Sequence, residues 1–174
     1  ERGIFNRQAS KTVAGRNKRR DDNFEFGTNP CSEIILRPFQ FCNLSEVVVR
    51  ESDKEEDLLE KVEAATILGT MQSTLTSFKY LRRQWKDTTE KERLLGVSLT
   101  GIMDHKILSG DVFNKAILPD LLKRMKQKAV EVNKVWAKRF GINQSTAITC
   151  VKPSGTVSQL VNAASGIHAR HNDH

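Results

Sequence analysis

The sequence predicts an α/β domain in which mostly parallel, buried strands are connected by long helices. Short aliphatic runs at 34–36 and 47–49 carry this prediction, because continuous apolar runs are typical of strands buried on both faces. A long stretch with apolar residues at helical spacing follows them. A strand candidate at 145–151 then continues the alternation of strands and helices.

Taken in order, residues 1–28 predict a loop-rich opening segment with a short helix, and residues 29–50 predict strands. Residues 51–140 predict a helical segment, and residues 141–174 a strand followed by a turn. Neither end of the chain carries a terminating element. We therefore expect a partial domain.

Three helices are expected within the helical segment. Apolar spacing predicts the first over about 54–85, and a second over Glu90–Met103. The third, about 119–140, has Pro in its first turn, and Gly141 is expected to end it.

Composition excludes several classes of protein. The 174 residues carry 28 Lys and Arg against 21 Asp and Glu, and 38% are hydrophobic, which is too apolar for a disordered chain. No apolar run reaches the roughly 18 residues of a membrane span, and no signal-peptide pattern is present. Three cysteines cannot close a disulfide framework, so we expect a cytoplasmic protein without a membrane partner.

The net charge of +7 is concentrated locally in the basic run Lys11–Arg20. Such a run could bind nucleic acid by neutralising phosphates. It lacks the interleaved aromatic residues of a single-strand binder, and Asp21 and Asp22 follow it at once. A solvated surface is the favoured interpretation, so a nucleic-acid partner is not expected.

A first candidate site comprises Asn29, Cys31 and Glu33. At alternate positions of an extended segment these side chains would face one side together. They supply an amide, a reactive sulfur and a carboxylate that can take a proton. Taken alone, the pattern fits a buried structural cysteine better.

Two further cysteines allow alternative interpretations. Cys42 lies eleven positions after Cys31 and could meet another thiol, or simply pack beside the neighbouring phenylalanines. Cys150 precedes the last turn and is expected to be a buried structural residue. No metal site is expected, because there is no CxxC pattern and the histidines are few and distant.

The turn after the last strand candidate combines a glycine with hydroxyl residues. Its backbone N–H groups and hydroxyls could bind an anion, although an ordinary helix-capping turn fits equally well. The Walker pattern is absent, since no Gly-Lys-Ser/Thr follows. The residues concerned are Pro153, Ser154, Gly155, Thr156, Val157 and Ser158.

Three motifs occur in a fixed order: N-P-C-S-E-I, R-P-F-Q-F-C-N-L-S-E-V, and C-V-K-P-S-G-T-V-S-Q-L followed by A-S-G-I-H. Together they resemble the catalytic core of ribonucleotide reductases, best of all the adenosylcobalamin-dependent (class II) type. The resemblance extends to E-R-G-I-F-N-R-Q-A and L-L-G-V-S-L-T-G-I-M-D, and so covers nearly the whole chain. It implies an internal part of the catalytic subunit, contributing part of a ten-stranded α/β barrel.

The resemblance also implies roles for the candidate residues. Cys31 matches the cysteine whose thiyl radical abstracts the 3′ hydrogen, Glu33 the carboxylate that takes the 3′-hydroxyl proton, and Asn29 the amide that holds the substrate hydroxyls. Cys42 matches one of two reducing cysteines that become a disulfide, whose partner lies upstream in the family. Residues 153–158 match the loop that binds the substrate phosphates.

By the same resemblance, the cofactor is adenosylcobalamin, bound mostly by regions outside this chain. The implied partners are a ribonucleotide substrate, the remainder of the reductase chain, and a thioredoxin-like or dithiol reductant. The alternative is a truncated module that binds a nucleotide phosphate without catalysis.

Overall fold

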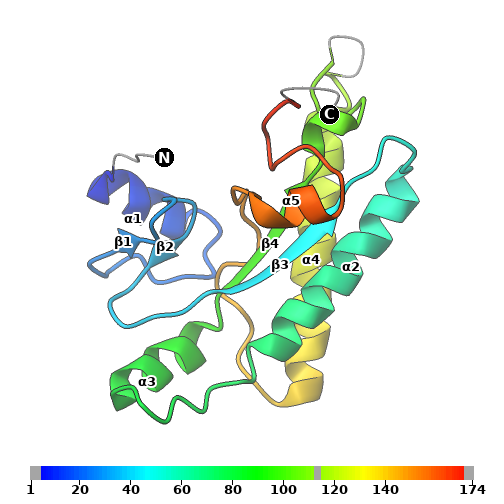
Figure 1. Ribbon diagram of the computed structural model, residues 1–174. Coiled ribbons are helices and arrows are strands. Elements are labelled where there is room, and N and C mark those ends of the chain that lie inside the picture. The colour runs from blue at the N-terminus through cyan, green and yellow to red at the C-terminus, as the bar shows by residue number, and fades with distance from the viewer. Residues whose placement is uncertain (1–4, 112–114, 171–174) are drawn as a thin grey trace.

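The computed structural model describes residues 5–111 and 115–170 (Figure 1). In chain order its elements are α1 (Arg7–Gly15), β1 (Gly27–Thr28), β2 (Ile35–Leu36), β3 (Asn43–Val48), α2 (Glu55–Gln72), α3 (Arg83–Glu92), β4 (Leu95–Thr100), the 3₁₀ turn η1 (Ile102–Asp104), α4 (Leu118–Phe140) and α5 (Thr156–Leu160).

The centre of the fold is the parallel pair β3 and β4, in which Asn43 lies opposite Leu95 and Val48 opposite Thr100. The long helices α2 and α4 run side by side along this pair (Figure 1). Parallel strands need a crossover connection, and α2 lies within it. The apolar side chains between the layers form the core: Val47, Val49, Leu58, Val62, Ala65, Leu95, Val97, Leu108, Leu121, Met125, Ala129 and Ile148. The predicted α/β class is confirmed.

The strand candidate at 145–151 lies along the other side of β4. The backbone N–H of Leu95 donates to the carbonyl of Ala147 at 3.0 Å. A single parallel bridge joins Val97 and Thr149, so the segment is extended but forms no full ladder. The prediction of an extended segment at this position is therefore confirmed, but the segment does not form a regular strand.

The last long helix agrees with its prediction. α4 begins with Pro in its first turn and ends at Gly141, whose φ of 65° is left-handed. Glycine adopts this conformation without a steric penalty, which is why it commonly ends helices.

The prediction of one helix over 54–85 is wrong in length. α2 stops at Gln72, where the Ser73 hydroxyl donates to the Thr70 carbonyl at 2.7 Å. This local bond satisfies a carbonyl of the last turn and competes with continued helix. The chain then turns before α3 begins at Arg83.

The predicted helix at 90–103 is also wrong. α3 ends at Glu92, followed by Arg93 with a left-handed φ of 47°, and residues 95–100 form β4. Five of the six β4 residues are buried. A strand covered on both faces needs apolar residues at consecutive positions, and this pattern is easily confused with that of a buried helix.

Gly101, directly after β4, is expected to tolerate no side chain. Its φ is 80°, and a Cβ would lie 2.5 Å from the backbone oxygen of Val49. We expect Gly101→Ala to lower the free energy of unfolding by at least about 1–2 kcal/mol, the usual cost of the left-handed conformation alone. Denaturant unfolding measures this loss. The matched control is Gly27→Ala, where a Cβ meets nothing within 4 Å; equal midpoints for the two variants would contradict the prediction.

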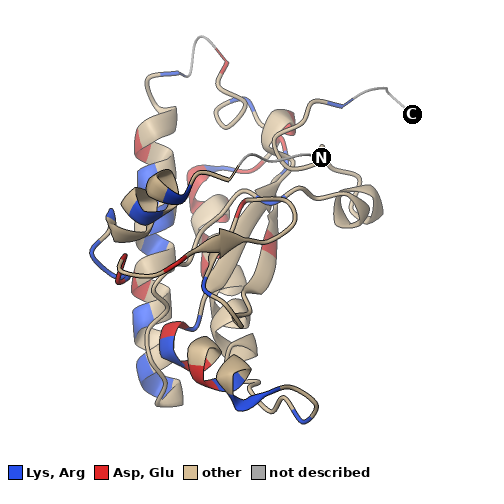
Figure 2. Ribbon diagram, turned by 90° about the vertical axis from the view of Figure 1, so that its left-hand side faces the viewer, with Lys and Arg blue, Asp and Glu red and all other residues tan. Residues whose placement is uncertain are grey.

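Lys and Arg residues follow the length of α4 and also occur on α1 (Figure 2). The basic run Lys11–Arg20 is not one continuous cationic surface, because Arg20 is buried against Glu92 and Lys11 lies 3.8 Å from the carboxylate of Glu25. Among the helices of the described ranges, none has the length and apolarity needed to cross a membrane.

Candidate functional site

The segment around Cys31 forms the loop of a short antiparallel hairpin. β1 and β2 pair with Gly27 opposite Leu36. Within the loop the Ser32 N–H donates to the Asn29 carbonyl at 3.0 Å, and Ser32 has a left-handed φ of 64°. The expected extended segment with alternating side chains is therefore a turn, and Cys31 is exposed on it.

The turn brings Asn29 and Glu33 into contact. The Asn29 side-chain nitrogen donates to Oε1 of Glu33 at 2.6 Å, while its Oδ1 accepts the backbone N–H of Ile34 at 2.9 Å. Both ends of the amide are thereby fixed, and with them the carboxylate.

Glu33 also contacts the other end of the chain. The Lys152 ammonium lies 3.0 Å from Glu33 Oε1, and the Glu33 side chain is only 7% exposed. Burial acts to raise the pKa of Glu33, but a backbone N–H and the bonds from Lys152 and Asn29 outweigh it, so this pKa lies below its usual value. The carboxylate is thus ionised at neutral pH.

Leu44, Glu46, Gly96 and Ser98 lie on the face of β3 and β4 opposite the helices, because side chains alternate along a strand. We call this the site face. A Cβ on Gly96 would lie 3.3 Å from Cys42 Sγ and 3.2 Å from Cys150 Sγ, so the two sulfurs are within about 6.5 Å of each other. The absence of a side chain at Gly96 makes room for both thiols.

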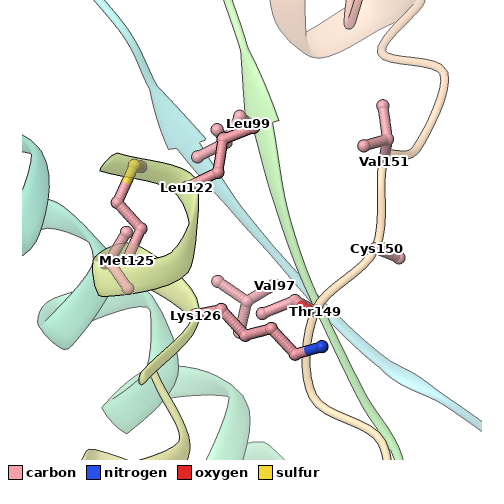
Figure 3. Close-up of a pocket in the computed structure, with 9 residues that line it drawn as sticks. Val97, Leu99, Leu122, Met125, Lys126, Thr149, Cys150 and Val151 are labelled. Atoms are coloured by element: carbon pink, nitrogen blue, oxygen red, sulfur yellow. The ribbon is translucent and has the colours of Figure 1, made fainter. Parts of the chain in front are cut away.

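Cys150 therefore has a position that the sequence analysis did not anticipate. It borders an apolar cavity of about 340 Å³ between α4 and β4, but its side chain points away from Met125 (Figure 3). Burial, then Cys150 and Glu33, raise the pKa of Cys42 to about 12, and burial followed by Glu33 raises the pKa of Cys150 to about 11. Both remain protonated thiols at neutral pH.

The turn at 152–157 lines a cavity of about 370 Å³ with residues of the site face. The turn is anchored by Lys152, whose backbone N–H donates to Ser98 Oγ at 2.8 Å. Ser154 Oγ is buried without a hydrogen-bond partner among the described residues.

The other turn residues differ in their surroundings. Gly155, Thr156 and Val157 are exposed and Pro153 is partly buried. Ser158 is buried, and its hydroxyl donates to the carbonyls of Ser154 and Gly155, so it shapes the turn from inside. No group of three His, Cys, Asp or Glu suited to a metal ion occurs within 5–111 and 115–170.

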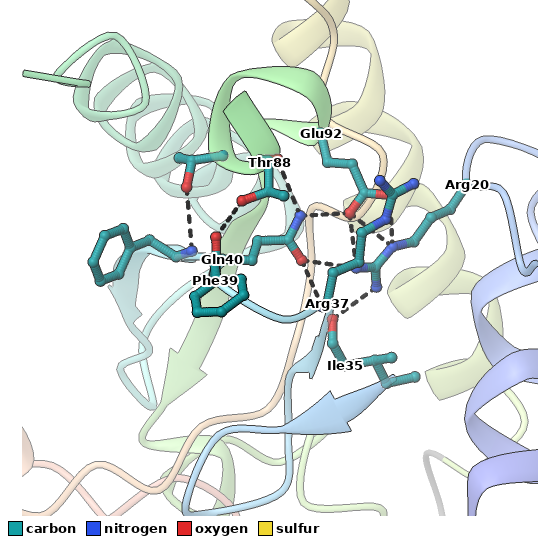
Figure 4. A network of polar contacts seen from close by, with 9 residues as sticks. Arg20, Ile35, Arg37, Phe39, Gln40, Thr88 and Glu92 are labelled. Carbon is teal, nitrogen blue, oxygen red and sulfur yellow. Dashed lines mark hydrogen bonds and ion pairs between the residues drawn. The ribbon is translucent and has the colours of Figure 1, made fainter. Parts of the chain in front are cut away.

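A buried charge network supports the hairpin (Figure 4). Glu92 accepts from Arg20 Nη2 at 2.8 Å and Gln40 Nε2 at 2.6 Å, and lies 3.2 Å from Arg37 Nη2. Arg20 also donates to the carbonyl of Ile35 in β2 at 2.7 Å. This network joins the segment after α1, the chain between Cys31 and Cys42, and α3.

Sequence reasoning missed the Glu92 network. The sequence places Arg20 in a basic run interpreted as a solvated surface, and Glu92 within the helix predicted over Glu90–Met103. The available signal was the position of Arg37 and Gln40 inside the R-P-F-Q motif, where a charged and an amide residue flank apolar ones.

Comparison with known proteins identifies several relatives of this chain. The adenosylcobalamin-dependent ribonucleoside-triphosphate reductase of Lactobacillus acidophilus is 30% identical over 193 residues, which cover 97% of this chain and 26% of that protein. The enzyme of the same name from Lactobacillus leichmannii is 28% identical, with the same coverage. No protein-family model matches the chain.

A solved structure of a protein of the same type also matches this chain. The crystal structure of a B12-dependent (class II) ribonucleotide reductase superposes with a TM-score of 0.67 and 26% identity, covering 83% of this chain and 23% of that one. The chain spans about a quarter of the length of the curated relatives it matches. The first four residues of the E-R-G-I-F-N-R-Q-A motif lie outside the described residues. Over nearly its whole length, the chain is therefore a homologue of the adenosylcobalamin-dependent ribonucleotide reductases.

Proposed function

We propose that this chain carries part of the active site of an adenosylcobalamin-dependent ribonucleotide reductase, which converts a ribonucleotide to a 2′-deoxyribonucleotide in the cytoplasm. The observation that carries the proposal is the ion pair between Glu33 and Lys152, 119 positions apart in the sequence. It joins the hairpin that bears a free thiol to the turn that offers an unpartnered hydroxyl.

Cys31 starts the reaction. Parts of the protein outside this chain would mostly hold adenosylcobalamin, which would supply the radical chemistry that converts the Cys31 thiol to a thiyl radical. Cys31 suits this exchange because it is exposed on the hairpin loop and forms no disulfide. The thiyl radical then takes the 3′ hydrogen atom of the substrate, and the thiol is restored.

Glu33 and Asn29 control the proton of the 3′-hydroxyl. Oε1 of Glu33 is engaged by Asn29 and Lys152, whereas Oε2 is buried without a partner in the described structure. Oε2 therefore accepts the 3′-hydroxyl proton. The amide of Asn29 has a second N–H, which is left for a substrate hydroxyl.

Cys42 supplies reducing equivalents as the 2′-hydroxyl leaves as water. A hydrogen-atom donor must keep its S–H bond, and a pKa of about 12 keeps Cys42 protonated at neutral pH. Two thiols reduce one ribonucleotide, giving one deoxyribonucleotide, one water and one disulfide. The second thiol comes from the remainder of the reductase, and a thioredoxin-like or dithiol partner reduces the disulfide again.

The turn at Pro153–Ser158 binds the substrate phosphates through Ser154 Oγ and exposed backbone groups. β3, β4 and the segment 145–151 are three parallel neighbours within the proposed ten-stranded barrel. The barrel would continue beyond 149–151, where the chain borders the apolar cavity of Figure 3.

The test compares this 174-residue chain with a chain completed with the regions that its relatives carry outside this span, which we call the full-length reductase. We expect the full-length protein to form deoxyribonucleotides with adenosylcobalamin and a dithiol, and the chain alone to form none, because it holds one reducing cysteine and little of the cofactor surface. Product is measured by chromatography of labelled nucleotides. Product from the chain alone would overturn its assignment as a part of the catalytic site. Nucleotide binding without product by the full-length protein would favour the phosphate-binding module.

A further inference from the structure

Lys152 connects two parts of the site that are otherwise separate in the chain. Its backbone N–H is held by Ser98 Oγ on β4 at 2.8 Å, and Pro153 restricts the backbone that follows. A Cβ on Gly166 would lie 3.1 Å from the carbonyl oxygen of Lys152, so the segment around Gly166 packs closely against Lys152. The backbone that carries the Lys152 side chain is thus held in place directly before the turn at Pro153–Ser158.

The Lys152 side chain extends from this backbone position to the hairpin loop, where its ammonium contacts one oxygen of Glu33. Oε1 receives both Lys152, at 3.0 Å, and Asn29, at 2.6 Å, while Oε2 receives neither. The carboxylate carbon and both oxygens are coplanar with Cγ, so holding Oε1 on a side chain whose backbone belongs to the hairpin loop restricts the direction of Oε2.

We propose that Lys152 is the positioning residue for Glu33: its ammonium holds Oε1, so that Oε2 is fixed in place to accept the proton of the substrate's 3′-hydroxyl. This inference rests on the proposed function and adds a residue to which the family resemblance assigned no role.

The charge of Lys152 has a second effect. A nucleotide phosphate in the turn would lie near the Glu33 carboxylate, and two anions in one partly buried site repel each other. The ammonium belongs to the turn and contacts Glu33, so its positive charge would offset this repulsion. The hydrogen bond to Glu33 raises the pKa of Lys152, so the ammonium stays charged throughout the neutral range.

Other charged and titratable groups near Glu33 do not replace Lys152. The thiols of Cys42 and Cys150 are neutral at pH 7. Four cationic residues line a cavity of about 210 Å³ that Glu33 also borders, and none of them donates to its carboxylate: Arg16, Arg19, Arg20 and Lys126.

The experiment uses Lys152→Met in the full-length reductase and measures kcat and KM across pH. An opposite charge lowers the pKa of a carboxyl group, so removing the ammonium raises it. The acidic limb of kcat/KM is then expected to move to higher pH by about one pH unit. Because Oε2 of Glu33 is no longer held in place, kcat at pH 7 is expected to fall about tenfold. Lys152→Arg, which keeps the charge, should restore most of kcat. Lys152→Gln provides the same neutral test if Lys152→Met lowers the unfolding midpoint.

The matched control is Lys134→Met on the exposed side of α4, which should leave the pH profile unchanged. A higher KM with an unmoved acidic limb would mean that Lys152 only binds phosphate, and would overturn the inference. Equal loss of activity in the Met, Gln and Arg variants would mean a purely structural role, with the same consequence. Glu33→Gln separates the proposed role of Glu33 from the inference on Lys152. If Glu33→Gln retains full activity, the proposed role of Glu33 is wrong. If Glu33→Gln is inactive while Lys152→Met has normal activity, only the inference on Lys152 is wrong.

Discussion

Replacing Cys31 by serine in the full-length reductase is expected to abolish every chemical step, including loss of the substrate's 3′ hydrogen. An O–H bond is too strong to be oxidised in place of a thiol. The thiols of Cys42 and Cys150 cannot substitute, because they lie at Gly96 on the site face and not on the hairpin loop.

Cys42→Ser should have a different outcome, because Cys42 acts after the substrate radical has formed. The 3′ hydrogen should still be abstracted, but reduction should stop, and the substrate radical should decompose with release of free base. The contrast between the two variants is the largest effect that the proposed mechanism predicts.

The measurement follows exchange of the 3′ hydrogen and release of free base in each variant. Cys150→Ser is the matched control: it alters a third thiol near Cys42 to which the mechanism gives no step, so turnover should persist. If Cys31→Ser releases base while Cys42→Ser is wholly inert, the two roles have been assigned the wrong way round.

The second large effect concerns stability and is expected from Glu92→Gln. The Glu92 side chain is 2% exposed, and those of Arg20 and Arg37 are 3% and 7% exposed. Removing the carboxylate charge takes away the anion that both buried guanidinium groups contact. Breaking a buried ion pair from one side typically costs about 3–5 kcal/mol, so the midpoint of denaturant unfolding should fall substantially.

Asp87→Asn, in the same helix α3, is the control for this prediction. Asp87 pairs with Arg83 at 3.6 Å on the surface, with 59% and 90% of the two side chains exposed. Exposed pairs contribute about 0–1 kcal/mol, so this variant should unfold near the parent midpoint. A Glu92→Gln protein as stable as Asp87→Asn would show that the network contributes little.

Local signals identified much of the fold. Pro in the first turn and Gly141 at the end bound α4 because both residues act through their own backbone preferences. β4 was mistaken for helix because its consecutive apolar residues satisfy either pattern, and only burial on both faces decides between them. Pairing partners, which lie far away in the sequence, supply that information.

Part of the candidate site could also be proposed from the sequence. Motif order pointed to Asn29, Glu33 and the turn at 153–158, since each motif is a short contiguous string. The contact between Glu33 and Lys152 was not predictable from the residues, because it depends on how two distant segments meet. The neighbouring thiols at Gly96 depend on strand order in the same way.

The Glu92 network also bears on the order in which the molecule folds. Strands of two residues, as in the β1–β2 hairpin, do not hold together by themselves in water. The hairpin depends on Arg20, whose partner Glu92 lies 72 positions further along the chain. Contacts of such sequence separation form slowly, because a long loop must close first. During synthesis, the thiol at the tip of the hairpin therefore acquires its fixed position only after α3 has emerged and docked.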